Sequence, residues 1–347
     1  MRILVIGGTG FIGSCIVERL ALEGHRVAVV HRGITAKRAL PENVEEIQSS
    51  RNELGNCRRS FEQLAPDVVL DCILSSRQQA EALVALFRNI TPRIVALSSQ
   101  DVYRAVGLLH RIEEGPLQPV PLTEASELRT APGPYSKESL QQLSRVFSWL
   151  DEDYDKILVE EVILGDALIR GTILRLPMVY GPGDPLHRLF GYLKRMYDGR
   201  PHILLQEDAA RWRASRGYVE NVAAVVVLAT TAARAAGRVY NVAEPEAFEE
   251  QTWVQRIARA AGWEGRVIAM PAAHMPAHLK VNYRSEQHWE VSSERIRAEL
   301  GFAEPVPFEV GLKRTIEWER ANTPGPGPSP SEYAAEDASV AAWMERS

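Results

Sequence analysis

The sequence predicts an α/β fold in which helices cover both faces of a doubly wound parallel sheet, with a smaller C-terminal substrate lobe. Three observations support this prediction. Residues 2–6 form an apolar run without alternation, which is typical of a parallel strand buried on both faces. Similar runs recur through the first half of the chain, with helical periodicity between them. A glycine-rich turn at residues 7–13 then joins the first strand to an amphipathic segment.

The glycine-rich turn predicts a site for a pyrophosphate. Glycine permits positive φ and places no Cβ in the way of a phosphate, and the first N–H groups of a helix attract anions. Strand, glycine turn and helix together indicate a dinucleotide site far more strongly than a glycine pattern alone. The spacing is G-x-x-G-x-x-G. The residues expected to contact the cofactor here are Gly7, Thr9, Gly10, Phe11, Ile12 and Gly13.

The remaining elements follow from the same patterns. The longest apolar stretch, residues 222–236, contains threonines and an arginine and is shorter than a membrane span, so it predicts a buried helix. Helical periodicity also predicts helices at 14–22 and 77–87. The further expected strands are 26–30, 67–73, 93–97, 171–176 and 238–242.

The alternation of elements divides the chain into parts. Residues 1–182 are predicted to form the dinucleotide-binding domain, to which residues 215–245 return. Residues 183–214 and 246–320 are mixed in pattern and are predicted to form a substrate-binding lobe over the sheet edge. A Pro/Gly/Ser-rich linker and a C-terminal tail make up residues 321–347.

Composition and charge narrow the class of partner. The chain has 347 residues, 45% hydrophobic and 24% charged, with a formal net charge of −5. With this negative net charge the chain has no excess of basic residues that would favour binding to nucleic acid or to a membrane surface. We therefore expect a small-molecule substrate. The three cysteines lack paired spacing, and the first apolar run is too short for a signal peptide, which indicates a cytoplasmic protein. Assembly into a homodimer is left open.

Four motifs in a fixed order give the chain a family resemblance. They are residues 7–13 (GGTGFIG), 97–103 (LSSQDVY), 174–184 (LRLPMVYGPGD) and 216–223 (RGYVENVA). On these motifs the chain resembles the extended short-chain dehydrogenase/reductase family of NAD(P)-dependent epimerases and dehydratases, over about residues 1–320. The resemblance implies a Rossmann-type cofactor domain. It also implies that Ser99 hydrogen-bonds the reacting oxygen and that Pro177 contacts the cofactor, although Ser99 also suits the cap of a turn.

The family's central motif, Tyr-x-x-x-Lys on a helix, is absent. In the family the lysine binds the nicotinamide ribose and lowers the pKa of the tyrosine, which exchanges a proton with the substrate. Two registers compete for this place. Tyr135 lies at about the family's distance from Thr123, but Ser139 then stands where the lysine belongs. Lys156 begins a second candidate, and it lies 19 positions before Arg175, enough for one helix and a turn.

Lys156 is therefore taken as the cofactor lysine, and residues 132–151 as an insertion. The nearest phenol is Tyr154, which cannot share a helical face with a residue two positions away. It can still reach the site from an irregular turn before the helix. In this register Glu152 stands at the position of the motif's tyrosine, where it is an alternative acid–base group. It is also explained as part of an acidic first turn that complements the helix dipole. The predicted catalytic residues are Ser99, Tyr154 and Lys156.

The end of the second expected strand indicates the cofactor. An acid there would bind the ribose hydroxyls of NAD, but the residues are His31, Arg32 and Gly33. Arg32 suits bidentate pairing with a 2′-phosphate, or else it stacks on the adenine or faces solvent. We therefore expect NADP or NAD, with NADP slightly favoured. Arg51 lies where the family commonly has an acid beside the adenine.

Two further arginines are candidates for substrate binding. Arg211 and Arg216 flank Trp212 near the region where the family grips a nucleotide diphosphate, and a solvated basic turn would explain them equally. No metal site is expected, because Pro276 prevents the helix that would align His274 with His278.

The function predicted from these residues is an NAD(P)-dependent epimerase/dehydratase-type enzyme acting on a sugar or sugar nucleotide by hydride transfer. A net NADPH-dependent ketone reductase is one alternative. The other is a cofactor-binding regulatory or interaction protein without catalysis, supported only by the missing Tyr-x-x-x-Lys motif.

Overall fold

A seven-stranded parallel sheet forms the centre of the molecule, which confirms the predicted fold class. The computed structural model describes residues 1–33 and 40–345. Within these residues the strands pair in the order β10-β6-β5-β4-β1-β2-β3, and each pairing is parallel. The strands are β1 Arg2–Ile6, β2 Arg26–His31, β3 Glu45–Gln48, β4 Val68–Asp71, β5 Arg93–Ser99, β6 Arg170–Leu176 and β10 Val239–Asn241.

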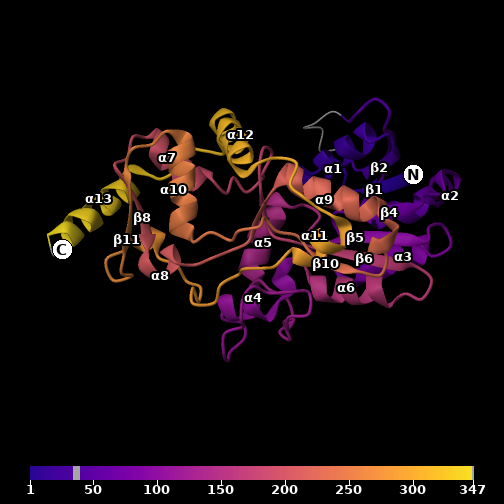
Figure 1. Cartoon of the computed structure of the whole chain (residues 1–347), viewed down its shortest axis with the longest axis horizontal. Helices are drawn as coiled ribbons and strands as arrows, with labels where there is room; N and C mark the ends of the chain where they lie inside the picture. The colour runs from indigo at the N-terminus through magenta and orange to yellow at the C-terminus, as the bar shows by residue number, and fades with distance from the viewer. Residues whose placement is uncertain (34–39, 346–347) are drawn as a thin grey trace.

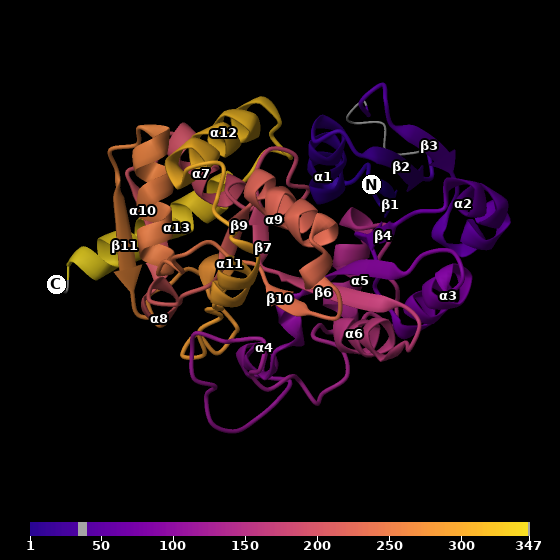
Figure 2. The same cartoon turned by 45° about the vertical axis from the view of Figure 1, so that its right-hand side comes forward.

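Helices cover both faces of this sheet because alternate side chains of each strand point to opposite sides. In β1, Ile3 belongs to the core shared with α1 and α9, whereas Leu4 belongs to the core shared with α3 and α6. Figure 2 shows α1 and α9 above the strands and α3 and α6 below them. Their bounds are α1 Phe11–Leu22, α3 Arg77–Phe87, α6 Lys156–Gly165 and α9 Val219–Thr231.

The order of the strands reverses beside β1, since β2 lies on one side of it and β4 on the other. Ligands of open α/β sheets bind outside the carboxyl ends of the strands at such a reversal. The glycine-rich turn follows β1 directly, and Ser99 ends β5. The fold therefore brings the 7–13 and 97–103 motifs to one edge of the sheet.

The edge strand β3 is an element that the sequence patterns do not reveal. Glu45, Glu46 and Gln48 are exposed, and Ile47 alone of the four packs against the core. A short edge strand with one apolar residue shows neither alternation nor an apolar run. Sequence periodicity therefore has nothing to detect here.

A second group of elements lies beyond the sheet, at the left of Figure 1. Strands β8 and β11 pair in parallel there, under the helices α7 and α10. A two-stranded pairing of β7 with β9 lies between this group and the main sheet. The bounds are β7 Met178–Tyr180, α7 Phe190–Tyr197, β8 His202–Gln206, α8 Glu207–Ala210, β9 Arg216–Tyr218, α10 Glu250–Ala261 and β11 Arg266–Met270.

The C-terminal tail forms a helix that docks on this second group. Residues 322–329 contain no helix or strand, and α13 (Pro330–Met344) starts with a capping box between Ser329 and Glu332. Arg195 of α7 donates to Glu336 of α13 at 2.6 Å, and both side chains are buried. Figure 1 shows α13 at the opposite end of the molecule from the N-terminus.

The remaining helices connect these parts. Among the described residues, no helix combines the length and the apolar character that crossing a membrane requires. The bounds are α2 Arg58–Leu64, α4 Arg104–Leu109, α5 Lys137–Val146, α11 Glu294–Leu300 and α12 Phe308–Ala321.

Candidate active site

The glycine turn is built so tightly that two of its glycines cannot be replaced. Gly7 has a φ of +82°, and a Cβ on Gly13 would lie 2.2 Å from the carbonyl oxygen of Gly7. Gly10 is different, because its Cβ would meet only that same oxygen, at 3.5 Å. Gly10 is the N-cap of α1 and has no side chain to cap the helix. The first N–H groups of α1 are thus left for an anion, and the space over Gly10 fits a pyrophosphate.

Two later motifs pack against this turn and against each other. A Cβ on Gly183 would lie 3.5 Å from the ring of Phe11, which brings the 174–184 motif to the glycine turn. A Cβ on Gly217 would lie 3.1 Å from the ring of Pro177, so the 216–223 motif lies directly on that motif. Three of the four motifs therefore meet around the start of α1. The cofactor contacts of Thr9, Ile12 and Pro177 stay predictions from the sequence.

Arginines follow the ends of β2 and β3, and the one after β2, Arg32, stands where an acid would favour NAD. Arg32 donates from Nη2 to the hydroxyl of Ser148, in the inserted segment, at 2.6 Å. Arg51 donates to both carboxylate oxygens of Asp71, at 2.6 and 2.8 Å, and Asp71 is fully buried. Arg51 thus pairs with the end of β4, whereas among the described residues the partner of the Arg32 guanidinium is an exposed hydroxyl, which a phosphate can displace.

Arg32 is predicted to distinguish the two cofactors. Replacing Arg32 with Ala is expected to weaken NADPH binding by about 10- to 100-fold more than NADH binding, because a charge-assisted contact of about 1.5–3 kcal/mol is lost. Calorimetric titration of each cofactor measures the difference. Ser148→Ala is the matched control, since it removes the hydroxyl partner of Arg32 and leaves the guanidinium. Equal losses for both cofactors in Arg32→Ala would show that Arg32 does not contact a 2′-phosphate.

Lys156 lies at the carboxyl edge of the sheet, as the first residue of α6. Its side chain is 4% exposed, and Nζ donates to the backbone oxygens of Leu97, at 3.0 Å, and Leu74. Burial lowers the pKa of Lys156 to about 8, against the opposing charges of Asp101 and Asp71. A buried ammonium between the ends of β4 and β5 is a suitable donor to the hydroxyls of a ribose.

Tyr154 reaches the same place because it precedes the helix. Asp155 is the N-cap of α6 and has extended backbone angles, so the rotation of 100° per residue does not apply between Tyr154 and Lys156. Nζ of Lys156 lies 5.8 Å from the centroid of the Tyr154 ring. Arg129 fixes this turn through a buried bond of 3.0 Å to Asp155. The irregular turn thus brings together two side chains that a regular helix would separate.

The hydroxyl of Tyr154 is bonded to a buried carboxylate that the sequence reasoning missed. Tyr154 donates to Oδ2 of Asp101 at 2.7 Å, and Tyr135 donates to the same oxygen at 3.3 Å. The backbone N–H of Asp101 in turn donates to the hydroxyl of Ser99 at 3.2 Å. Both tyrosines of the competing registers therefore meet at Asp101. The only signal for it was a charged residue two positions after the buried strand β5, within the 97–103 motif.

Burial sets the protonation of this cluster. It raises the pKa of Asp101, and burial together with the charge of Asp101 raises the pKa of Tyr154 and of Tyr135 well above the ordinary value. The resemblance implied that Lys156 lowers the pKa of Tyr154. In this structure burial and the charge of Asp101 raise that pKa instead. Tyr154 is thus held as a neutral phenol, which is the form that donates a proton.

Asp101 is expected to control the pH dependence of the reaction. Its charge raises the pKa of both Tyr154 and Lys156, so Asp101→Asn should lower both values. Tyr154 acts as an acid only below its pKa, and Lys156 is charged only below its own. The alkaline limb of the pH–rate profile should therefore move to lower pH. Asp337→Asn, an exposed ion-pair variant on α13, is the control. An unchanged profile would contradict a role for Asp101.

Other candidates for the acid–base group lie elsewhere. Glu152 is exposed on the turn before α6. The hydroxyl of Tyr103 donates to Asn241 at 2.6 Å and accepts from Arg175 at 3.0 Å. Arg175 also pairs with Glu160 at 2.7 Å, with both side chains buried. These contacts join β6, β10 and α6 to Tyr103, the N-cap of α4, and hold together the part of the structure behind the site.

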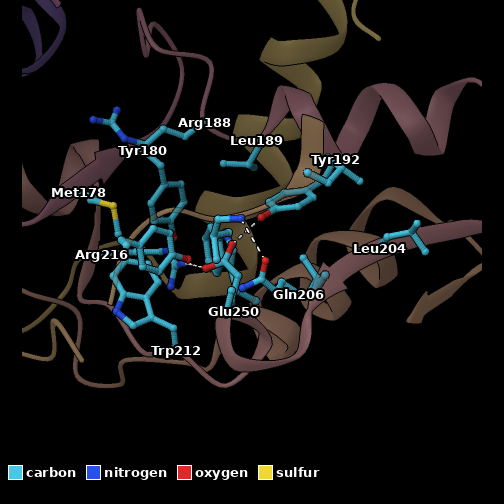
Figure 3. Close-up of a pocket in the computed structure, with 16 residues that line it drawn as sticks. Met178, Tyr180, Arg188, Leu189, Tyr192, Leu204, Gln206, Trp212, Arg216 and Glu250 are labelled. Atoms are coloured by element: carbon cyan, nitrogen blue, oxygen red, sulfur yellow. Dashed lines mark hydrogen bonds and ion pairs between the residues drawn. The ribbon is translucent and has the colours of Figure 1, made fainter. Parts of the chain in front are cut away.

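A cavity of about 340 Å³ lies among β7, α7, β8, β9 and α10 (Figure 3). Arg216 lines it and is bonded there to Glu250. Arg211, the other predicted substrate residue, is exposed and pairs with Glu207 at 2.9 Å. The two arginines are therefore separated, one in the cavity and one at the surface. Among the described residues, no group of His, Cys, Asp and Glu is arranged to hold a metal.

Comparison with known proteins identifies the class that this fold and site define. The chain matches the NAD dependent epimerase/dehydratase family over residues 3–243. It belongs to that family, as the four motifs predicted, and the cofactor of the family is NAD(P).

Two curated relatives are named as a reductase and a dehydrogenase. The chain is 27% identical to 2′-dehydrokanamycin reductase from Streptomyces kanamyceticus over 280 residues, which are 78% of this chain and 70% of the relative. It is 25% identical to dTDP-6-deoxy-L-talose 4-dehydrogenase (NAD(P)(+)) from Kitasatospora kifunensis over 280 residues, 78% of this chain and 82% of the relative.

Solved structures share the fold. UDP-glucose 4-epimerase from Thermotoga maritima, solved with UDP-glucose, superposes with a TM-score of 0.63 at 19% identity, covering 92% of this chain and 99% of that one. MoeE5 in complex with UDP-glucuronic acid and NAD gives a TM-score of 0.65 at 21% identity, with coverage of 92% and 99%. At these identities the likeness establishes the Rossmann-type fold.

Proposed function

We propose that this member of the epimerase/dehydratase family transfers a hydride at an oxygen-bearing carbon of a sugar, with Tyr154 as the acid–base group. The observation that carries the proposal is the convergence of Tyr154, Lys156 and Ser99 at the carboxyl ends of β4 and β5. Tyr154 and Ser99 both bond to Asp101, and the Tyr154 ring lies 5.8 Å from the ammonium of Lys156. This geometry restores the partners of the missing Tyr-x-x-x-Lys motif by a different local route.

The residues present fit NAD(P). The glycine turn supplies free helix N–H groups and an open surface over Gly10, and Lys156 supplies a buried donor next to Tyr154. When bound, the nicotinamide ring supplies the donor or acceptor of the hydride. Tyr154 gives a proton to the substrate oxygen during reduction and takes it back during oxidation, while Ser99 orients that oxygen. The preference for NADP rests on Arg32 alone.

Net reduction of a sugar carbonyl is the variant that the relatives favour. The protonated Tyr154 can donate to a developing alkoxide in this reaction, as it can in the return step of an epimerase. The names of the two curated relatives, a reductase and a dehydrogenase, support the same direction. An epimerase needs the identical groups and returns the hydride to the opposite face. A sugar nucleotide as substrate, an arrangement into a cofactor domain and a substrate lobe, and a homodimer remain predictions of the sequence.

Turnover assays with matched substrates test the proposal. Reduction consumes one NADPH and one proton for each carbonyl converted to an alcohol, so the loss of NADPH absorbance with a keto sugar measures it. Epimerisation of UDP-glucose gives no net change in NADH and is followed by analysis of the sugar. Conversion by either route supports hydride transfer. Cofactor binding without turnover of keto sugars, amino glycosides or sugar nucleotides would favour a binding protein instead.

A further inference from the structure

The inserted segment, residues 132–151, is anchored on both sides of the glycine turn. Near its start, the hydroxyl of Tyr135 donates to Oδ2 of Asp101, just beyond β5, at 3.3 Å. Near its end, Ser148 accepts the bond from Arg32, just beyond β2. The strand order β5-β4-β1-β2 places the ends of β4 and β1 between these two contacts. Figure 1 shows α5, the helix of this segment, at the edge of the sheet away from the N-terminus. The segment therefore passes across the carboxyl ends of β4 and β1.

These two strand ends carry the groups that fit the cofactor. The glycine turn, residues 7–13, follows β1, and the ammonium of Lys156 donates to the backbone oxygen of Leu74 in the loop after β4. An open α/β sheet binds its ligand outside the strand ends, where the strand order reverses. The inserted segment reaches this place, because the ring centroid of Trp149 lies 5.6 Å from Nζ of Lys156. A dinucleotide bound at the turn and at Lys156 therefore lies between the strand ends and the inserted segment.

Hydrogen bonds to the loop after β4 fix the end of the segment. The hydroxyl of Ser75 donates to the backbone oxygen of Trp149 at 3.4 Å and accepts from the backbone N–H of Asp151 at 3.0 Å. The hydroxyl of Ser76 donates to the carboxylate of Asp151 at 2.9 Å. The chain thus returns to the sheet at a defined place. The helix α5 is suspended between this place and the contact of Tyr135 with the end of β5.

The apolar side of α5 packs on no hydrophobic core. Leu140 and Leu143 are half-buried, as is Phe147 directly after the helix, and no residue of α5 is buried. Their spacing of three and four places these side chains on one face, which is turned toward the protein because the polar residues of α5 are the more exposed ones. Among the described residues, none of the three belongs to a hydrophobic cluster.

A short helix needs a partner for such a face. An isolated helix of 10 residues is marginal in water, and most helices in proteins are stabilised by packing an apolar face. The inner face of α5, made by Leu140, Leu143 and Phe147, lies across the strand ends where the dinucleotide binds. The position of the face therefore identifies its partner as the bound cofactor.

We propose that the inserted segment forms the outer wall of the NAD(P) site, and that α5 moves aside when the cofactor enters or leaves. Bound NAD(P) is held between the ends of β1 and β4 and the inner face of α5. Because α5 is held at its ends and not by a core, it can lift while the sheet stays folded. This assigns a binding role to a segment that lies outside the four motifs. It holds whichever reaction the enzyme catalyses.

Hydrogen exchange of the full chain, with and without saturating NADP⁺, tests this wall. The amides of residues 139–147 are expected to exchange at least about 10-fold more slowly with NADP⁺, because the cofactor gives α5 a surface to pack on. The amides of α13, at the opposite end of the molecule, should not change. Unchanged or faster exchange of residues 139–147 in the loaded protein would overturn the inference.

Two double variants of α5 provide a matched test. Leu140→Ala with Leu143→Ala truncates the inner face, and Gln142→Ala with Arg145→Ala makes equally spaced changes on the opposite, exposed face. Displacement of bound NADPH by excess NADP⁺, followed by stopped-flow fluorescence, should be about 10-fold faster for the inner-face variant and unchanged for the outer-face variant. Release from the inner-face variant that is no faster than from the outer-face variant would contradict the wall.

The outcomes are separate from those of the proposed function. Slowed exchange of residues 139–147 in a protein that converts no sugar would support the wall and count against hydride transfer. Failure to bind either NADPH or NADH would overturn the wall together with the dinucleotide site at the glycine turn. Hydrogen exchange in the wild-type protein decides the matter even if a variant does not fold.

Discussion

Tyr154→Phe is expected to lower kcat by about 10²- to 10⁴-fold while leaving the affinity for NAD(P) nearly unchanged. The substitution removes one oxygen, the one that donates to Asp101 at 2.7 Å and is held protonated by its surroundings. The ring keeps its place 5.8 Å from the ammonium of Lys156. Steady-state kinetics together with a cofactor titration therefore separate the loss of a proton donor from damage to the cofactor site.

The matched control is Tyr240→Phe in β10. Tyr240 is also buried, and its hydroxyl also donates to a carboxylate, that of Glu299 at 2.8 Å, but it lies outside the cluster. It should change kcat little. Tyr135→Phe provides the second comparison, because Tyr135 shares Asp101 at the longer distance of 3.3 Å. Full activity in Tyr154→Phe together with a large loss in Tyr135→Phe would transfer the acid–base role to Tyr135.

Lys156→Ala extends the same test to the cofactor. The variant should weaken NAD(P) binding and turnover together, since the buried ammonium beside Tyr154 is lost. Ser99→Ala should lower kcat in the direction of Tyr154→Phe, because a hydrogen-bond partner of the reacting oxygen is removed. Near-normal activity of Lys156→Ala would mean that the register chosen from the spacing to Arg175 is wrong.

Gly10→Val is expected to weaken NAD(P) binding by at least about 100-fold in a protein that is still folded. The backbone at Gly10 is extended, at φ −77° and ψ 178°, which valine adopts readily. Its Cβ would meet only the oxygen of Gly7, at an ordinary 3.5 Å. The added side chain instead fills the space where the pyrophosphate approaches the first N–H groups of α1.

Gly13→Val supplies the contrast. Its Cβ would lie 2.2 Å from the backbone oxygen of Gly7, so the turn must shift, at a cost of about 1–3 kcal/mol or more of the free energy of unfolding. Thermal unfolding and cofactor titration of both variants distinguish the two effects. Wild-type affinity in folded Gly10→Val would remove the basis for a dinucleotide site at this turn.

The position of Lys156 shows what the spacing between motifs can predict by itself. The distance to Arg175 indicated one helix and a turn, and α6 indeed begins at Lys156 and precedes β6. The spacing did not predict how Tyr154 comes to lie near Lys156. That position depends on the extended Asp155, which Arg129 holds from 26 positions away in the sequence. A contact of this kind leaves no periodic signal.

Asp101 and Arg216 are residues whose surroundings the sequence did not predict. Asp101 stands inside a motif that the sequence analysis quoted, yet its role follows only from the two tyrosines that converge on it from the inserted segment and the turn. Arg216 was expected to grip a diphosphate, because an arginine beside a tryptophan suits phosphate and base. In the structure Arg216 is paired with Glu250, on a different element.

The sequence by itself determined the parallel sheet, the glycine turn and the family, because apolar runs, helical periodicity and glycine spacing are local properties of the chain. The tertiary structure alone decided which phenol lies near Lys156, which carboxylate raises the pKa of Tyr154, and how the charges in the cavity are paired. These properties depend on burial and on partners far apart in sequence. Electrostatic effects in a buried site are set by what lies across the fold, and no local pattern encodes that arrangement.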